Sequence, residues 1–331
     1  MSEHVCVLGS NSFSGAHFVD RLLDEGYTVT GVSRSPEAHP VYLPYVRDGM
    51  RKAGFRFLKA DLNHDVDRLM EDMERHKPAY VVNFAAQGMV AESWLHPEQW
   101  LRTNTLSPLM LYERLRRCDW LRKFVQVSTP EVYGSTSGRV RESVRYDPST
   151  PYAVSKAAAD MNLMCFFRAY GFPVVFTRAA NVFGPCQRLY RIVPRAVLRF
   201  LTGGVVALHG GGHSVRSFIH IRDVADATLR VMRDGDPGEI FHIATDTAIS
   251  IRDLVHLVAQ AVQVDAEKHI RVAGERLGQD AAYLLDSSKI RAALDWSDTR
   301  SLEQGIDDTV RWVRDNLDTL QSQPHDYEHK E

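Results

Sequence analysis

Short apolar runs alternate with amphipathic stretches along the first 180 residues. The run "HVCVLG" at 4–9 predicts a buried strand, "SGAHFVDRLLDEG" at 14–26 has the apolar spacing of a helix, and "YTVTGVS" at 27–33 predicts a second strand. The alternation continues through "FRFLKADL", "DVDRLMEDMERH", "AYVVNFAA", "TNTLSPLMLYERLRR" and "KFVQVST". Strands that alternate with helices indicate an α/β fold with a Rossmann-like, doubly wound parallel sheet.

The pattern changes near residue 180. A helix near 152–169 precedes "PVVFTRAANVFG", after which glycines and loops become frequent, with later helices in "SIRDLVHLVAQAV" and "SLEQGIDDTVRWVRDNL". We expect a dinucleotide-binding domain over residues 1–180 and a smaller C-terminal α/β substrate domain, mainly over residues 181–318, with some segments returning to the first domain. The polar residues 319–331 predict a flexible tail.

The net charge and the cysteines indicate which binding partners and which cellular compartment to expect. The 331 residues include 40 basic and 42 acidic side chains, so nothing in the net charge favours nucleic acid or an anionic membrane as a partner. Four cysteines without CxxC spacing, and a start without the features of a signal peptide, predict a reducing, cytoplasmic setting and no bound metal. No apolar run approaches the roughly 18 residues that span a bilayer, which predicts a soluble protein.

The first strand-to-helix turn, "LGSNSFSG", has two glycines, Gly9 and Gly15, where backbone amides and a helix N-terminus can hold a pyrophosphate. Ser12 occupies the middle position at which a third glycine is common, so a tight turn without a ligand is the alternative. The position of the turn at the first crossover of an α/β pattern favours a dinucleotide site. The turn residues expected to contact it are Gly9, Asn11, Ser12, Phe13, Ser14 and Gly15.

The second strand ends in Ser33, Arg34 and Ser35, where NAD-preferring domains usually have an acidic residue. An arginine here pairs with a ribose 2'-phosphate, which favours NADP over the alternative, NAD. A solvated loop arginine is the other interpretation. Asp61 and Leu62 end the third strand and are expected near the adenine.

Tyr152 and Lys156 are four residues apart and therefore lie on one face of a helix. A nearby ammonium lowers the pKa of a phenol from about 10, so the tyrosine becomes a usable base. Surface neighbours at this spacing are common. Here, however, the preceding strand ends in Ser128 and Thr129, which could bind the same substrate hydroxyl, and this favours a catalytic pair.

Seven motifs in order resemble one family: "GSNSFSG", "ADL", "NFAAQ", "STPEVYG", "YAVSK", "RAANVFGP" and "RSFIHIRDVADA". The chain is similar to extended short-chain dehydrogenases/reductases, in the branch of NAD(P)-dependent nucleotide-sugar epimerases and dehydratases. It looks most similar to GDP-mannose and dTDP-glucose 4,6-dehydratases. The resemblance implies a tightly held nicotinamide cofactor, a nucleotide-diphosphate sugar as substrate and a homodimer formed through helices.

The resemblance also implies roles for individual residues. Thr129 orients the sugar 4-hydroxyl, Tyr152 takes its proton, Lys156 holds the tyrosine and the cofactor ribose, and Glu131 is the base at C5. In "NFAAQ", Ala85, Ala86 and Gln87 contact the cofactor. The substrate is bound by Ser128, Thr129, Glu131, Asn181, Arg188, Tyr190, Arg216 and Arg276, where paired arginines suit two phosphates.

Pro130 occupies the position of the aspartic acid that protonates the departing C6 hydroxyl in dTDP-glucose 4,6-dehydratases. Glu131 could act first as base and then as acid, because C5 and C6 are adjacent. The sequence therefore predicts an NADP-dependent nucleotide-sugar 4,6-dehydratase. The alternatives are a 4-epimerase, a C4 oxidoreductase or C5 epimerase, and a catalytically idle NADP-binding regulator; the nucleotide base and the sugar stay open.

Overall fold

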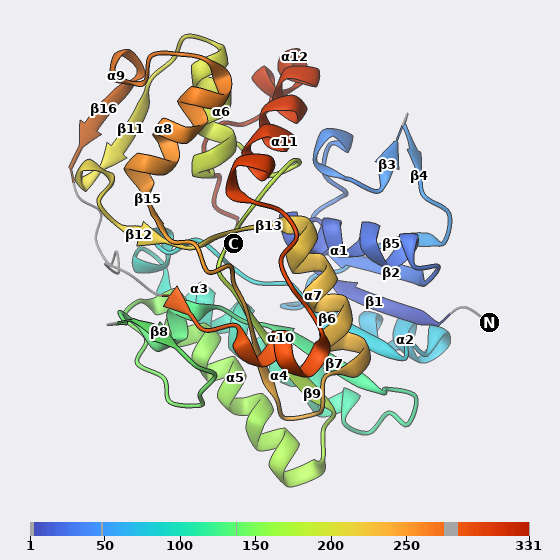
Figure 1. The fold of residues 1–331 in the computed structure, drawn as a ribbon. Coiled ribbons are helices and arrows are strands. Elements are labelled where there is room, and N and C mark those ends of the chain that lie inside the picture. Colours follow the sequence, from blue (N-terminus) through green and yellow to red (C-terminus); the bar gives the residue numbers. More distant parts are fainter. Residues whose placement is uncertain (1–2, 48, 137, 275–283, 331) are drawn as a thin grey trace.

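The protein is described by a computed structural model that covers residues 3–47, 49–136, 138–274 and 284–330. Seven parallel strands form one sheet in the order β14-β9-β7-β6-β1-β2-β5 (Figure 1). Their bounds are β1 His4–Leu8, β2 Thr28–Ser33, β5 Phe55–Lys59, β6 Tyr80–Asn83, β7 Lys123–Val127, β9 Val174–Ala179 and β14 Ile240–Ile243. The predicted doubly wound parallel sheet is confirmed.

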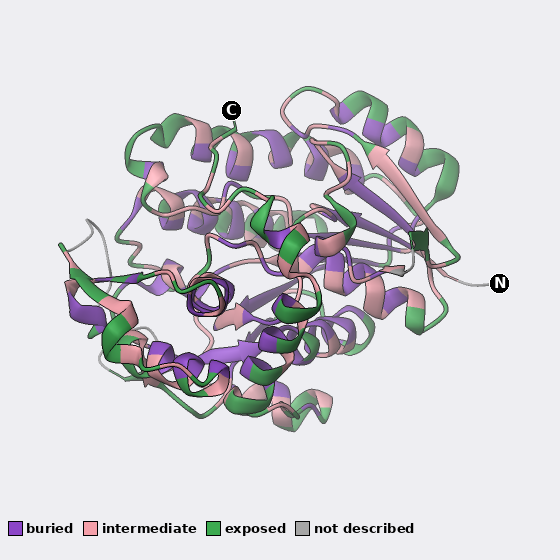
Figure 2. Cartoon of the chain, turned by 90° about the horizontal axis from the view of Figure 1, so that it is seen from above, coloured by how far each residue is buried: buried purple, intermediate pink, exposed green. Residues whose placement is uncertain are grey.

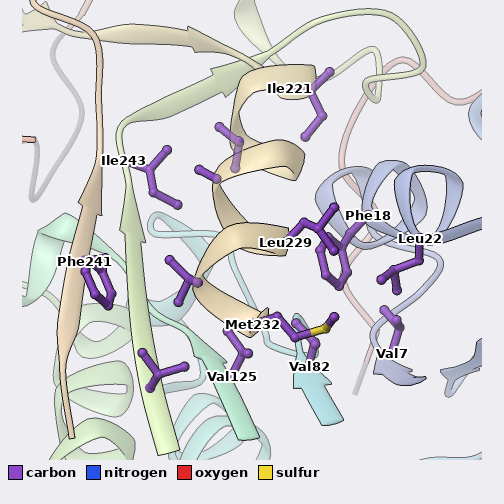
Figure 3. Packing of buried hydrophobic residues seen from close by; sticks show 14 of the residues in the cluster. Val7, Phe18, Leu22, Val82, Val125, Ile221, Leu229, Met232, Phe241 and Ile243 are labelled. Carbon is purple, nitrogen blue, oxygen red and sulfur yellow. The ribbon is translucent and has the colours of Figure 1, made fainter. Parts of the chain in front are cut away.

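Both faces of this sheet are covered by helices. Strand β1 shows this in sequence, because Val5 and Val7 belong to one buried cluster whereas Cys6 and Leu8 belong to another. The first cluster lies under α1 (Phe13–Asp24) and α7 (Ile221–Asp234), whose Phe18, Leu22 and Leu229 meet strand residues Val7 and Val82 (Figure 3). The second lies under three other helices: α2 (Val66–His76), α4 (Ser107–Leu115) and α5 (Pro151–Tyr170).

A smaller lobe has a hydrophobic cluster of its own. It contains α6 (Ile192–Leu201), α8 (Ile251–Val262) and α11 (Leu302–Asp315), with Val197, Leu254 and Val313 fully or almost fully buried between them. Figure 2 shows the buried inner faces and exposed outer faces of the helices throughout the molecule. The remaining elements are β3 Val46–Arg47, β4 Met50–Arg51, α3 Pro97–Leu101, β8 Arg139–Val140, β10 Asn181–Phe183, β11 Val206–His209, β12 Val215–Arg216, β13 Phe218–His220, β15 Ile249–Ser250, α9 Ala266–His269, β16 Ile270–Ala273, β17 Leu284–Leu285, α10 Ser288–Leu294 and α12 Leu317–Gln321.

The chain crosses between the sheet and the smaller lobe more than once. After β10, helix α7 packs on the sheet, and β14 pairs with β9, with Ile240 opposite Phe176. The domain division at residue 180 and the flexibility of residues 319–331 stay predictions. Residues up to Lys330 are described, and they lie against the rest of the chain.

One expected helix has a different form at its start. The helix expected from residue 103 begins as a π-helical turn, Arg102–Leu106, before α4. Pro108 lacks an N–H group and so cannot bond to the carbonyl of residue 104, which favours the wider turn. In the described part of the chain, no helix combines the length and apolarity that crossing a membrane requires.

Candidate active site

Residues that the sequence singled out follow four neighbouring parallel strands. β1 lies between β2 and β6, and β7 pairs with the other side of β6. The carboxyl ends of parallel strands meet at one edge of a sheet, so Gly9, Ser33, Ala85 and Ser128 begin loops on the same edge. Ligands bind at this edge where the strand order reverses, and here the reversal is at β1.

The turn after β1 leaves no room for side chains at its two glycines. Gly9 has φ +79°, and a Cβ there would lie 2.6 Å from the Ala85 nitrogen. A Cβ at Gly15 would lie 2.3 Å from the Gly9 carbonyl oxygen. Ser12 caps the following helix, since its hydroxyl accepts a 3.0 Å hydrogen bond from Gly15 N–H. This close backbone cradle at a helix N-terminus, which includes Phe13 and Ser14, fits the pyrophosphate of a dinucleotide.

Side chains tie this turn to the end of β2. The backbone N–H of Asn11 donates to Ser33 Oγ at 3.0 Å. The side-chain Nδ2 of Asn11 donates to the Ser35 and Pro36 carbonyl oxygens at 3.1 and 2.7 Å. Arg34 extends from the same loop and donates to the Lys330 carbonyl at 2.9 Å. These contacts hold the predicted 2'-phosphate arginine beside the glycine turn.

The end of the next strand closes this side of the site. Asp61 Oδ1 accepts a 2.8 Å hydrogen bond from Asn63 N–H and so shapes the loop after β5. Leu62 is buried beneath it. The pairing of β5 with β2 puts both residues at the outer end of the crevice, next to the Ser33–Ser35 loop.

The Tyr152 and Lys156 pair lies in the first turns of α5. Thr150 caps this helix by accepting a hydrogen bond from Ala153 N–H at 3.1 Å. Lys156 is 3% exposed, and its ammonium donates to the Val127 carbonyl oxygen at 2.8 Å. Burial lowers the Lys156 pKa to about 8, against the opposing charge of Asp160. The lysine is thus anchored to the end of β7.

The "STPEVYG" segment forms a 3₁₀ turn, Pro130–Tyr133, directly after β7. Thr129 caps it, with its hydroxyl accepting from Glu131 N–H at 3.3 Å, and Pro130 is buried in the first position. Glu131 is half-buried. The Ser128 hydroxyl donates to Asp160 Oδ2 at 2.6 Å, and its contact with the substrate stays a prediction.

A buried ion pair behind the site was not identified from sequence. Arg178 and Asp160 are both fully buried and 2.9 Å apart, and the Arg178 guanidinium also donates to the hydroxyls of Tyr133 and Tyr146. The pair joins β9 to α5, and because Asp160 also accepts a hydrogen bond from the Ser128 hydroxyl, it joins the end of β7 to α5 as well. The signal was present: a charged residue inside the apolar strand "PVVFTRA", and an acid one helical turn after Lys156.

Asn104, in the π-helical turn, is a second residue that sequence reasoning missed. Its Oδ1 accepts from Gln87 N–H at 2.7 Å, and its Nδ2 donates to the Gln87 carbonyl oxygen at 3.0 Å and to Ser155 Oγ at 2.9 Å. Asn104 therefore connects the Ala85–Gln87 loop, in which Ala86 is exposed, to the helix of Tyr152. An asparagine four residues before Pro108, within a predicted helix, was the available signal.

The other predicted substrate residues lie on the smaller lobe's side. Asn181 N–H donates to the Ser217 carbonyl oxygen at 3.0 Å, which brings β10 beside the buried Arg216. The Arg188 guanidinium lies 4.0 Å from the centre of the Tyr42 ring, and Tyr190 packs against Tyr327 at 5.4 Å between ring centres. Arg276 lies outside the described residues. Among the residues that the structure does describe, no group of three or more His, Cys, Asp or Glu is arranged to hold a metal.

Known sequences place this site in context. A family model described as GDP-mannose 4,6 dehydratase matches residues 6–309. A dTDP-glucose 4,6-dehydratase of Streptomyces antibioticus is 33% identical over 326 residues, covering 95% of this chain and 93% of the relative. A trifunctional UDP-glucose 4,6-dehydratase/UDP-4-keto-6-deoxy-D-glucose 3,5-epimerase/UDP-4-keto-L-rhamnose-reductase of Arabidopsis thaliana is 28% identical over 318 residues. The chain spans about half the length of that relative, 47%.

Solved structures agree with the sequence comparison. The dTDP-glucose 4,6-dehydratase DesIV from Streptomyces venezuelae, with NAD and TYD bound, superposes with a TM-score of 0.88 at 30% identity, covering 96% of this chain and 98% of that one. A UDP-glucose 4-epimerase of Thermotoga maritima, with UDP-glucose, gives a TM-score of 0.86 at 29% identity, with coverage of 95% and 99%. By its family match, its relatives and its motifs, the chain belongs to the GDP-mannose 4,6 dehydratase family.

Proposed function

We propose that this chain is an NADP-dependent nucleotide-sugar 4,6-dehydratase. The observation that carries the proposal is Glu131, a half-buried carboxylate on the turn that Thr129 caps at the end of β7. A carboxylate near the sugar is costly to bury unless it has a task. Removal of a C5 proton is such a task, and simple 4-epimerisation has no need of it.

A bound nicotinamide dinucleotide supplies a hydride acceptor and donor. The side chains of this chain handle the protons. Thr129 orients the 4-hydroxyl, Tyr152 takes its proton, and the Lys156 ammonium favours the phenolate form of that tyrosine. Once C4 is a ketone, Glu131 removes the acidified C5 proton. The protonated Glu131 then gives its proton to the C6 hydroxyl, which leaves as water, so Pro130 needs no acidic group. With the hydride returned to C6, C5 would take a proton from solvent and the proton held by Tyr152 would be released, so that the net change is the loss of one water.

Residues of the smaller lobe are proposed to hold the nucleotide diphosphate. Arg216 and Arg276 supply positive charge for two phosphates, and Asn181 supplies a hydrogen-bonding amide. Arg188 and Tyr190 line the nucleotide end, where the Arg188 guanidinium stacks on Tyr42. The bound TYD of DesIV and the UDP-glucose of the epimerase support a ligand of this class.

NADP is proposed over NAD because β2 ends in Ser33 and is followed directly by Arg34, and not by an acidic residue. DesIV was crystallised with NAD, so the two dinucleotides must be compared directly. The substitution Arg34→Ala should weaken binding of NADP and leave binding of NAD nearly unchanged, as measured by calorimetric titration. Equal effects on both would assign the chain to NAD.

The decisive experiment incubates the protein and its Tyr152→Phe variant with guanosine, thymidine, uridine and cytidine diphosphate sugars, and measures product mass. A loss of 18 Da, absent in the variant, supports the dehydratase. Unchanged mass with inverted C4 supports a 4-epimerase, which the superposition on the Thermotoga maritima enzyme makes the second candidate. Tight NADP binding without any turnover would indicate an idle regulator.

We also propose a homodimer. Large apolar side chains are exposed around α3, α4 and α5, namely Trp94, Leu95, Leu101, Leu106, Met110, Val154 and Met161. An exposed apolar face of this kind marks an interaction surface. One chain has a mass of 37.5 kDa. Light scattering after size-exclusion chromatography should give about twice this mass, and the substitution Met110→Glu should reduce the measured mass to that of a single chain.

A cytoplasmic location is part of the proposal. All four cysteines are free thiols in the structure, as is usual for proteins of reducing compartments. A fluorescent fusion that remains in the cytoplasmic fraction would agree with this location, and recovery from an oxidising compartment would contradict it.

A further inference from the structure

The C-terminal segment after α12 runs back toward the carboxyl edge of the sheet. In Figure 1 the C-terminus lies at the middle of the molecule, between the smaller lobe and the sheet. Alternate residues of this segment are exposed and partly buried: Asp326, Glu328 and Lys330 are exposed, whereas His325, Tyr327 and His329 are half-buried. This period of two is typical of an extended peptide lying in a groove.

The end of the segment reaches two of the residues proposed for the cofactor. The Lys330 carbonyl oxygen accepts hydrogen bonds from Gln87 Nε2 at 2.7 Å and from Arg34 at 2.9 Å. Gln87 follows β6 and Arg34 follows β2, and β1 lies between those strands. One oxygen atom that bridges both loops must lie across the end of β1, where the Gly9–Gly15 turn begins.

His329 and Tyr327 anchor the segment on both sides of the cleft. The His329 ring stacks on Trp100 of α3 at 5.1 Å and 8°, and its Nε2 is 2.5 Å from Gln99 Oε1. The Tyr327 ring packs edge-on against Tyr190.

A second set of contacts holds the segment to α6 and to the Gln87 loop. Asp326 pairs with Arg195, and the Tyr327 hydroxyl lies 3.5 Å from Gln87 Oε1. The segment is therefore held by aromatic, ionic and backbone contacts to both lobes.

We propose that the dinucleotide cleft is also a peptide-binding site, and that its ligand is this chain's own C-terminal segment, residues 325–330. The inference rests on the proposed function, because it requires that Arg34 and Gln87 bind the dinucleotide. The same donors cannot serve the Lys330 carbonyl and the cofactor at once, so segment and dinucleotide compete. The tethered segment acts at a high effective concentration and needs little intrinsic affinity.

Competition raises the apparent dissociation constants of NADP and NAD by the same factor, because either dinucleotide must displace the segment. A 2'-phosphate forms a charge-assisted, bidentate contact with arginine, whereas the Lys330 carbonyl is a neutral acceptor. NADP therefore keeps the higher affinity of the two whether or not the segment is present.

The test compares the full chain with a chain that ends at Pro324, by calorimetric titration with NADP and NAD. A segment that occupies the cleft 90% of the time raises the apparent dissociation constant about tenfold, so truncation should lower it by about that factor. The synthetic peptide of residues 322–331, added to the truncated protein, should raise it again. In the full chain, His329→Ala should act like truncation, whereas Glu328→Ala, at an exposed position, should leave the constant unchanged.

A second readout follows the segment itself. Saturating NADP should speed removal of the C-terminal residues by carboxypeptidase, because a displaced segment is accessible. Protection by NADP, or a dissociation constant that truncation leaves unchanged or raises, would overturn the proposal. Failure of both the full and the truncated chain to bind any dinucleotide would instead overturn the proposed function.

Discussion

The Lys156 ammonium donates a 2.8 Å hydrogen bond to the carbonyl oxygen of Val127, so that helix α5 is fastened to the end of β7. The lysine side chain is buried, and its charge is held there against the desolvation that lowers its pKa to about 8. Burial of this charge costs stability, as expected for a lysine with the catalytic role proposed above.

Replacement of Lys156 by methionine separates these two effects. Turnover should fall at least about 100-fold, since the phenol of Tyr152 loses the neighbouring charge. An unfolded lysine titrates near 10.5, so burial of the charge destabilises the wild type fully below pH 8 and ever less as pH rises to 10.5. The difference in urea unfolding free energy between variant and wild type should therefore shrink over that interval. A constant difference would contradict this account of Lys156.

Glu131→Gln tests the proposed base at C5. The amide cannot take a proton, so formation of the product 18 Da lighter should fall by at least about 100-fold, and exchange of the C5 hydrogen with deuterated water should stop. Binding of NADP should be unchanged, which serves as the control for folding. Dehydration at the wild-type rate would remove Glu131 from the mechanism.

Asp160→Asn removes the charge that pairs with buried Arg178. An unpaired buried charge destabilises a protein by about 3–5 kcal/mol, and urea unfolding should show a loss of this order. The matched control is Asp24→Asn. Asp24 is half exposed, and its partner Lys52 keeps a second ion pair with Asp20. Exposed ion pairs of this kind contribute about 1 kcal/mol or less to stability. Equal losses in the two variants would show that the buried pair has no special role.

Gly15→Ala tests the backbone cradle. The added Cβ would lie 2.3 Å from the Gly9 carbonyl oxygen, so the turn must shift, and NADP binding should weaken by roughly tenfold or more, with a stability loss on the order of 1–3 kcal/mol. Gly88→Ala is the control, because nothing lies within 4 Å of its added Cβ. Unchanged binding in Gly15→Ala would exclude the turn from the cofactor site.

His242 predicts part of the acid sensitivity. Its Nδ1 lies 3.2 Å from the Asp286 carbonyl oxygen and its Nε2 lies 2.8 Å from the Tyr133 hydroxyl, an arrangement that suits the neutral ring. Burial lowers the His242 pKa to about 3, whereas an unfolded histidine titrates near 6.5. Between these pH values the unfolded chain binds one more proton than the folded chain. The free energy of unfolding therefore decreases as the pH is lowered, by up to about 1.4 kcal/mol per pH unit. His242→Asn should reduce the slope of unfolding free energy against pH by that amount.

The sequence predicted the parallel sheet because its strands are short, apolar runs buried on both faces, as in Val5–Leu8, and such runs differ clearly from the amphipathic helices between them. The family resemblance followed from motifs that lie at strand ends. The pattern marks Arg178 as a charge inside an apolar strand, but it could not reveal that Asp160 is the partner of this arginine. Contacts between Gln87 and Lys330, 243 positions apart, are likewise invisible to any local pattern.

Strand β14 has a consequence for synthesis of the protein. It completes the sheet by pairing with β9, yet 60 residues, which include α6 of the smaller lobe and α7, separate Ala179 from Ile240. Until residue 243 has left the ribosome, β9 is an open edge that other chains can join. We infer that the nascent chain passes through an aggregation-prone interval. Residues 1–180 expressed alone, without β14, would carry that open edge permanently.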